Sequence, residues 1–302
     1  MKNIFVFYLL SFIFFVACQK DEQSVKQEET KKITVVSVNY PLHYFAQRIG
    51  GDQIEALLPV SPEGDPAYWK PDEAGIALFQ KADVILLNGA GYAKWTDKVS
   101  LPTSKMLNTS ESFKENYIEL HEGMTHSHGP EGEHVHKGYA FTTWLNLKFA
   151  IEQAAAVTTR LVQLLPEQRE YFELNFQELK TDLGILDEEL KKLGQDLQEQ
   201  NLFGSHPVYQ YLARGYGLTI KSEHWEPDQL ISKEQWKTFQ DKLKSHPGKI
   251  MLWEGPPLAD VQNQLMEAGV KTVVYNPCGN QPKSGDFVSV MKSNIENLRA
   301  AM

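Results

Sequence analysis

Residues 166–199 read PEQREYFELNFQELKTDLGILDEELKKLGQDLQE, and this stretch decides the architecture of the chain. Six leucines within it follow one another at alternating spacings of four and three residues, namely Leu179, Leu183, Leu186, Leu190, Leu193 and Leu197. These spacings place the side chains on one face of an α-helix, and Pro166 suits its first turn. Few heptads are sustained, so we expect one long helix packed on its own protein rather than a coiled coil. At about 1.5 Å per residue it would run roughly 45–50 Å.

Both flanks of this helix alternate short β-rich runs with helical stretches. Strands are expected at residues 33–38, 54–60, 84–88, 202–204, 218–220, 250–253 and 270–275. Helices are expected at 44–49, 72–81, 208–216, 233–244 and 258–268, and from residue 287 onward. Such alternation predicts mostly parallel sheets covered by helices. We therefore expect an α/β protein with two α/β lobes, residues 33–165 and 200–302, joined by a long rigid helix at 166–199, with a ligand cleft between the lobes.

The N-terminus has the features of an export signal. An apolar run at residues 4–16 is too short to span a bilayer but fits the hydrophobic region of a secretory signal. The following FVAC at 15–18 resembles a bacterial lipobox, which predicts removal of residues 1–17 and lipid attachment at Cys18, with residues 18–32 as a flexible tether. A plain secretory peptide or an N-terminal anchor is the alternative. The acidic cluster at 19–22 resembles cell-surface export signals, so both the periplasmic face and the cell surface remain open.

Composition narrows the possible partners and reactions. The net charge of −9 argues against nucleic acid, whose binding relies on clustered Lys and Arg. Only two cysteines occur among 302 residues, which excludes a disulfide scaffold and leaves His and carboxylates as metal ligands. Nucleophile-elbow, phosphate-loop and His-Glu-x-x-His motifs are all missing from the sequence, so we predict that the protein is not an enzyme.

Several short motifs occur in an order that resembles one known family. They are VVSVNYPL at 35–42, DP at 65–66, KAD at 81–83, NGAG at 88–91, WL at 144–145 and MKSNI at 291–295. In this order they resemble the zinc/manganese-type solute-binding proteins of bacterial ABC importers, over essentially the whole mature chain. The resemblance implies a membrane-tethered monomer that holds Zn²⁺, or Mn²⁺ or another divalent metal, in an interlobe cleft. It also implies an ABC permease or another membrane complex as partner.

A histidine-rich loop is the second feature that such zinc-binding proteins often carry. Five of the nine histidines fall within residues 121–136, at His121, His126, His128, His134 and His136. Neutral imidazole suits zinc, and the alternate spacing of the two His-x-His pairs lets two side chains meet one ion in a flexible segment. We expect this loop to bind zinc with modest affinity; an incidental polar loop is the alternative.

The family's cleft ligands are largely missing. The resemblance places its four ligands at Ala67, Thr142, His206 and Asn276, and only His206 retains a strong metal-binding side chain. Loss of three ligands predicts that the inherited zinc site is absent or much weakened. Glu254, after a predicted strand, and Cys278, two residues beyond Asn276, could form a displaced site with His206.

Two functional hypotheses follow. In the first, the protein is a lipid-anchored solute-binding protein that takes up a transition metal through the His-rich loop and a modified cleft. In the second, the same scaffold binds a non-metal ligand or a protein partner, with aromatic cleft walls. The aromatic residues available for such walls are Tyr68, Trp69, Trp144, Trp225 and Trp253, although packing of the lobes is the simpler interpretation. The isolated His224 and His246 are expected at the surface.

Overall fold

A computed structural model describes residues 32–62, 64–120, 125–127, 133–135 and 138–302, with backbone alone for 125–127 and 133–135. The expected signal, Cys18 and nearly all of the tether lie outside the described residues, as do His121, His128 and His136. Residues 32–302 form one compact unit. Within the described ranges, no helix combines the length and the apolar character needed to cross a membrane.

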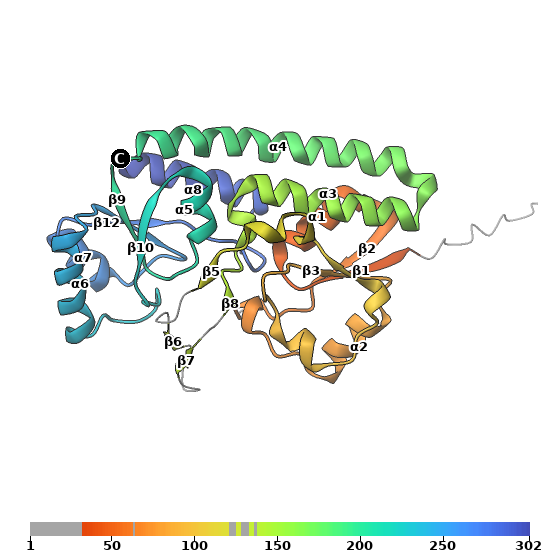
Figure 1. Ribbon diagram of the computed structural model, residues 1–302, viewed down its shortest axis with the longest axis horizontal. Coiled ribbons are helices and arrows are strands. Elements are labelled where there is room, and N and C mark those ends of the chain that lie inside the picture. The colour runs from red at the N-terminus through yellow and green to blue at the C-terminus, as the bar shows by residue number, and fades with distance from the viewer. Residues whose placement is uncertain (1–31, 63, 121–124, 128–132, 136–137) are drawn as a thin grey trace, which may run out of the picture. The chain divides into compact units, whose positions relative to one another are not determined.

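The first lobe is built on a four-stranded parallel sheet (Figure 1). Its order is β2-β1-β3-β4, from strands β1 (Ile33–Ser37), β2 (Ile54–Leu57), β3 (Val84–Leu87) and β4 (Met106–Asn108). Central strand residues such as Val35 and Ile85 are fully buried, as expected for a sheet covered on both faces. The helices of this lobe are α1 (Tyr40–Gly50), α2 (Glu73–Lys81) and α3 (Leu147–Leu164).

The second lobe repeats the design with a second parallel sheet of order β10-β9-β11-β12. The strands are β9 (Asn201–Gly204), β10 (Thr219–Ser222), β11 (Ile250–Trp253) and β12 (Lys271–Val274), and the helices are α5 (Gln210–Tyr216), α6 (Lys233–Ser245), α7 (Ala259–Glu267) and α8 (Phe287–Ala301). Two antiparallel pairs complete the described strands: β5 (Glu119–Leu120) with β8 (Gly138–Tyr139), and β6 (Thr125–Ser127) with β7 (Glu133–Val135).

The long helix α4 (Arg169–Asp196) contacts elements of both lobes, packing on α1 and α3 and on α5 and α8 (Figure 1). Its leucine stripe is buried, with Leu179 and Leu183 fully inaccessible to solvent. The predicted two lobes, parallel sheets and long helix are therefore confirmed. The α-helix is shorter than the predicted stretch, because residues Pro166–Gln168 form a 3₁₀ turn and the α-helix ends at Asp196.

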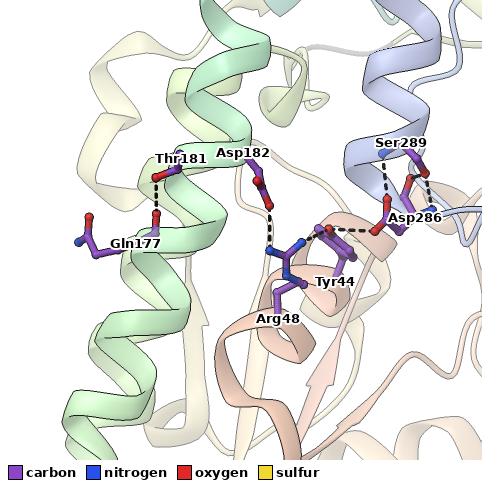
Figure 2. A network of polar contacts seen from close by, with 7 residues as sticks. All are labelled: Tyr44, Arg48, Gln177, Thr181, Asp182, Asp286 and Ser289. Atoms are coloured by element: carbon purple, nitrogen blue, oxygen red, sulfur yellow. Dashed lines mark hydrogen bonds and ion pairs between the residues drawn. The ribbon is translucent and has the colours of Figure 1, made fainter.

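A polar relay connects α4, α1 and α8 (Figure 2). Arg48 of α1 donates to Asp182 of α4 and to the hydroxyl of Tyr44, both at 2.8 Å. The Tyr44 hydroxyl in turn donates to Asp286, the N-cap of α8, at 3.2 Å, and Asp286 accepts from the Ser289 amide at 2.8 Å. The linking helix is thus fixed to both lobes by hydrogen bonds as well as by its leucines.

Several predicted boundaries were wrong for identifiable reasons. Helix α1 starts at Tyr40 rather than residue 44, because the Asn39 side chain caps it by accepting from the Leu42 amide. Strand β2 ends before Pro59, which has no N–H for the ladder. Helix α3 was not predicted, since its apolar face lies in a stretch that also contains the threonines and alanines of 154–159.

His246 is also a correction, because it lies in the interior and not at the surface. His246 is only 3% exposed, and its Nε2 lies 2.8 Å from the Leu202 carbonyl oxygen. The ring packs against the edge of Phe203. A hydrogen bond of this kind offsets the cost of burying a polar group, whereas His224 is exposed as predicted.

Candidate functional site

A cleft of about 290 Å³ is lined by residues of both lobes. Four of its polar residues each follow a strand of the second sheet: His206 after β9, Glu226 after β10, Glu254 after β11 and Asn276 after β12. Because the carboxyl ends of parallel strands meet at one edge of a sheet, side chains far apart in the sequence converge there. Topology alone therefore brings an imidazole, two carboxylates and an amide to one site.

The first lobe supplies the opposite wall, which includes Tyr92 and Phe141. Asn88, at the end of β3, donates to the Phe141 carbonyl at 2.8 Å and accepts from Gln153 at 3.2 Å, which fixes the wall to α3. The loop then turns through left-handed backbone at Gly89, where a Cβ would lie 2.0 Å from the Ser110 hydroxyl. This turn delivers Tyr92 to the cleft.

Two hydrogen bonds join the lobes beside the cleft. The Trp144 indole N–H donates to the Pro277 carbonyl at 2.7 Å, and the Thr142 hydroxyl donates to the Val208 carbonyl at 2.5 Å. Both donors come from the first lobe and both acceptors from the second. The relative position of the two walls is therefore set by contacts in the cleft itself.

His206 lies between two carboxylates. Its Nδ1 is 3.1 Å from Oε1 of Glu254, and its Nε2 is 3.7 Å from Oε1 of Glu226. Burial alone would lower the pKa of His206, but the hydrogen bond with Glu254 and the negative charges of Glu254, Glu226 and Asp65 together raise it. The imidazole is held in a strongly anionic environment.

Two carboxylates of the cleft, Asp65 and Glu226, are themselves destabilised as anions. Desolvation is the largest influence and raises the pKa of Asp65 to about 6; the hydrogen bond from Ala67 opposes the shift, and the charges of Glu254 and Glu226 add to it. The pKa of Glu226 is also raised, mainly by desolvation and further by Glu254. None of the described residues that line the cleft is Lys or Arg. The cleft thus carries an excess of negative charge that a bound cation would relieve.

Comparison with protein families decides the assignment. The family model described as ZnuA, zinc-uptake complex component A, periplasmic, matches residues 35–301. This chain belongs to the ZnuA family.

Members with curated names are moderately similar in sequence. The chain is 26% identical over 289 residues to the high-affinity zinc uptake system protein ZnuA of Bacillus subtilis, covering 90% of this chain and 88% of that one. It is 26% identical over 300 residues to the zinc-binding lipoprotein AdcA of Streptococcus pneumoniae, covering 95% of this chain. The match extends over 58% of AdcA, so the chain spans little more than half of that relative.

Solved structures show the same ZnuA-family fold. The metal-dependent lipoprotein YcdH from Bacillus subtilis superposes with a TM-score of 0.76 at 23% identity, covering 90% of this chain and 100% of that one. The Zn(II)-bound ZnuA-like domain of Streptococcus pneumoniae AdcA superposes with a TM-score of 0.75 at 22% identity, covering 90% and 99%. At these identities the likeness supports the fold, which agrees with the two parallel sheets and the long helix described above.

The residues at the expected ZnuA-family ligand positions have other roles here. Ala67 is buried in the first-lobe core and offers no donor atom. Thr142 lines the cleft, but its hydroxyl is already engaged with the Val208 carbonyl. Asn276 also lines the cleft, and its Oδ1 accepts from the Cys278 amide at 2.7 Å. Of the four positions, His206 presents an imidazole to the cleft.

The structure separates the two suggested replacement ligands. Glu254 lines the cleft and contacts His206, whereas Cys278 is 2% exposed and is not among the described residues that line the cleft. Burial is the main cause that raises the pKa of the Cys278 thiol to about 12, so it remains protonated at neutral pH. The predicted displaced site of His206, Glu254 and Cys278 is therefore corrected: His206 and Glu254 lie in the cleft, and Cys278 does not line it.

The expected aromatic wall is also only partly present. Trp144 lines the cleft, but Trp225 and Trp253 lie in a separate hydrophobic cluster of the second lobe. Tyr92 and Phe141, which were not predicted, take their place in the lining. Packing accounts for most of the aromatic residues singled out in the sequence.

The His-rich loop is more regular than predicted where the structure describes it. Strands β6 and β7 pair in antiparallel register, with His126 opposite His134. The binding of zinc by these histidines stays a prediction.

Three cleft residues were missed at the sequence level: Asp65, Glu226 and Tyr92. Asp65 was visible only as half of an Asp-Pro motif, and the structure shows its Oδ1 accepting from the Ala67 amide at 2.8 Å as the cap of a short 3₁₀ turn. Glu226 also follows a strand end, but it lies four residues beyond Ser222 at the end of β10, whereas Glu254 comes directly after β11, so the position of Glu226 was the weaker signal. Tyr92 gave no such signal, because it is placed by the left-handed turn at 89–91.

The arrangement can bind a cation but is not a preformed cage. Across the described ranges, no three His, Cys, Asp or Glu side chains already stand close enough together to hold an ion. One imidazole with carboxylates at 3.1 and 3.7 Å is nevertheless a nitrogen and oxygen donor set of the kind that divalent transition metals accept.

Proposed function

We propose that this chain is an extracytoplasmic, lipid-anchored solute-binding protein that captures a divalent transition metal, zinc foremost, for an ABC importer. The observation that carries the proposal is His206 in the cleft, flanked by Glu254 and Glu226, with Asp65 also in the cleft lining. Membership of the ZnuA family and relatives named for zinc uptake and zinc binding support zinc as the cargo. The His-rich loop would add a second, weaker place of capture.

A non-metal ligand is the less supported alternative. The cleft carries acidic residues, and its described lining includes no Lys or Arg to pair with an organic acid. The buried tryptophans of the second lobe are engaged in packing. A cationic cargo fits the observed charge better than a neutral or anionic one.

Calorimetric titration of the mature chain with Zn²⁺ at neutral pH tests the proposal. We expect zinc uptake, with part of the heat removed when the five loop histidines are replaced by alanine. The absence of any zinc uptake by the unaltered chain would refute the function.

Lipid anchoring through Cys18 needs its own experiment. Expression in a bacterial host supplied with labelled fatty acid should label the unaltered protein and leave Cys18→Ala unlabelled. Equal labelling of both proteins, or of neither, would contradict a lipid anchor at this position. Association with a permease could then be tested by reconstituting the anchored protein with membranes that contain the importer.

A further inference from the structure

We infer that Glu226 and His206 are paired ligands of the cleft metal, and that Glu254 positions the imidazole without binding the ion. This ligand set differs from the four positions that the family resemblance marks, three of which have lost their ligands. The inference rests on the proposed function, since it assigns the residues that hold its cargo.

The distance between the two atoms carries the assignment. His206 Nε2 and Glu226 Oε1 lie 3.7 Å apart. An ion at about 2.1 Å from each atom, a usual length for zinc bonds to His and carboxylate, would make an angle of roughly 120–125° between them. That angle is somewhat wider than the tetrahedral value and needs only a small shift of either side chain. The two donors therefore already stand at bridging distance.

Glu254 meets the other nitrogen at hydrogen-bond distance, 3.1 Å from Nδ1. A metal-binding histidine commonly donates its second ring N–H to a carboxylate, which fixes the tautomer and the ring orientation. With Nδ1–H directed to Glu254, the lone pair of Nε2 is directed toward Glu226. Each carboxylate thus has a separate role, which is set by the ring nitrogen that it faces.

The other inherited positions offer only neutral oxygen atoms or no ligand atom at all, which are weaker ligands for a divalent ion than the carboxylate of Glu226. Thr142 donates its hydroxyl proton to a carbonyl, and the Asn276 oxygen accepts a backbone hydrogen bond. Ala67 has no ligand atom. The ion would consequently lie between His206 and Glu226.

A second observation points independently to a bound polar group. Tyr92 lines the cleft and is only 7% exposed. Its buried hydroxyl has no hydrogen-bond partner among the residues that the structure describes. A buried hydroxyl without a partner is costly. A water on the metal would satisfy it and would add an oxygen to the ligand set. The coordination we propose is therefore the imidazole of His206, the carboxylate of Glu226 and water.

This ligand set has a consequence for selectivity. Imidazole suits zinc, whereas carboxylate and water also suit Mn²⁺. Replacement of two histidines by oxygen ligands should weaken zinc binding and narrow the preference for zinc over Mn²⁺. The chemical class of the ligand is a divalent cation that keeps part of its hydration shell.

The test uses the full mature chain with the loop histidines His121, His126, His128, His134 and His136 replaced by alanine, so that calorimetry reports the cleft. In this background Glu226→Ala should lower zinc affinity by about 100-fold or more, and Glu254→Gln by about 10–100-fold, as expected for a residue that orients a ligand. Asp260→Asn is the control, because it removes an exposed charge in the first turn of α7 that does not line the cleft. It should change the affinity by no more than about threefold.

A crystal of the same protein grown with Zn²⁺, measured at the metal edge, should place the ion between Nε2 of His206 and Glu226. Melting curves without metal establish that each variant folds. If zinc binds in the cleft and Glu226→Ala leaves the zinc affinity unchanged, the assignment of Glu226 as a ligand is wrong. Zinc binding by the unaltered chain that disappears entirely with the loop histidines would also overturn it, while leaving the proposed function intact. No zinc binding by any form would reject both.

Discussion

Oε1 of Glu254 lies 3.1 Å from Nδ1 of His206, and the two residues follow neighbouring strands, β11 and β9, of one parallel sheet. The contact is therefore fixed by sheet topology rather than by a flexible loop. His206 is 8% exposed and Glu254 is only partly exposed, so the pair lies where water screens charge poorly. The imidazole is both oriented and made more basic by the same neighbour.

This contact predicts the pH dependence of metal binding. Protonated imidazole cannot bind a metal, and the raised pKa of His206 means that protons compete at a higher pH than for an ordinary histidine. Zinc affinity of the loop-histidine variant should fall as the pH is lowered through this raised pKa. Calorimetric titrations over a pH series would measure the fall, and Glu254→Gln should move it to lower pH. A fall centred below the ordinary range of histidine would contradict the predicted shift.

The raised pKa of His206 also affects the stability of the metal-free protein, but with the opposite pH dependence: low pH weakens metal binding and strengthens the folded state. A raised folded-state pKa contributes stability that is fully present below the unfolded pKa of histidine and is lost as the pH rises through the folded pKa. The groups responsible are Glu254, Glu226 and Asp65, with the His224 ring packed edge-on at 5.9 Å. NMR titration of His206 in the metal-free protein would give the folded pKa directly.

We predict that replacing Cys278 does not change zinc affinity. Its thiol is buried and protonated, and it lies outside the cleft lining. Cys278→Ala should therefore leave zinc affinity within about twofold of the unaltered chain, because no ligand is lost. Zinc calorimetry on both proteins is the measurement. A loss as large as that expected for Glu226→Ala would restore the cysteine to the ligand set.

Much of the fold could be predicted from the sequence because its signals are local. The leucine spacing of 179–197 follows the 3.6-residue period of a helix, and the strands of both sheets are short continuous apolar runs, as expected for parallel strands buried on both faces. Helix α3 was missed because its buried face, which includes Ala150, Ala154 and Val157, is made partly of small side chains. His246 was misplaced because its partner, the Leu202 carbonyl, is 44 residues away.

The site was less predictable because its residues come from different strand ends that meet only in the folded sheet. His206 and Glu254 were identified, the first by motif and the second by its position after a strand. Glu226 occupies the same kind of position, but the sequence does not show which strand ends lie next to one another. Tyr92 depends on left-handed backbone at an alanine as well as at glycines, which periodicity does not reveal. Strand order and loop geometry therefore held the missing information.

Two substitutions of Thr142, to asparagine and to histidine, form an informative pair. Thr142 lines the cleft, and the sequence resemblance leads us to expect that relatives carry an imidazole at this position. Thr142→His should raise zinc affinity about tenfold or more in the loop-histidine background, since it adds a nitrogen ligand to a site that has one. Thr142→Asn is the control for loss of the hydrogen bond to Val208 without a new imidazole. Calorimetry should show no gain for the asparagine variant. Equal affinities for both variants would mean that position 142 cannot reach the ion.

The relay that connects α1 and α8 gives a prediction about stability. Asp286 accepts from the Ser289 amide at 2.8 Å and from the Tyr44 hydroxyl at 3.2 Å (Figure 2). Desolvation is the largest single influence and raises its pKa, but the hydrogen bonds from Ser289 and Tyr44 and the charge of Arg48 together lower it. Asp286→Ala removes the helix cap and should lower the free energy of unfolding by about 0.5–2 kcal/mol at neutral pH. Asp286→Asn keeps a capping oxygen and removes only the charge.

The two variants separate the cap from the charge when urea unfolding is followed at neutral and at acidic pH. A lowered folded-state pKa contributes stability that is present above the unfolded pKa of aspartate and is lost as the pH falls through the folded pKa. The difference between the unaltered chain and Asp286→Asn should therefore shrink in acid, while the cap lost in Asp286→Ala persists as a deficit relative to Asp286→Asn. Asp260→Asn, an exposed carboxylate in the first turn of α7, should change stability by no more than about 0.5 kcal/mol. If the unaltered chain exceeded Asp286→Asn by the same amount at both pH values, the charge of Asp286 would not be the source of that stability.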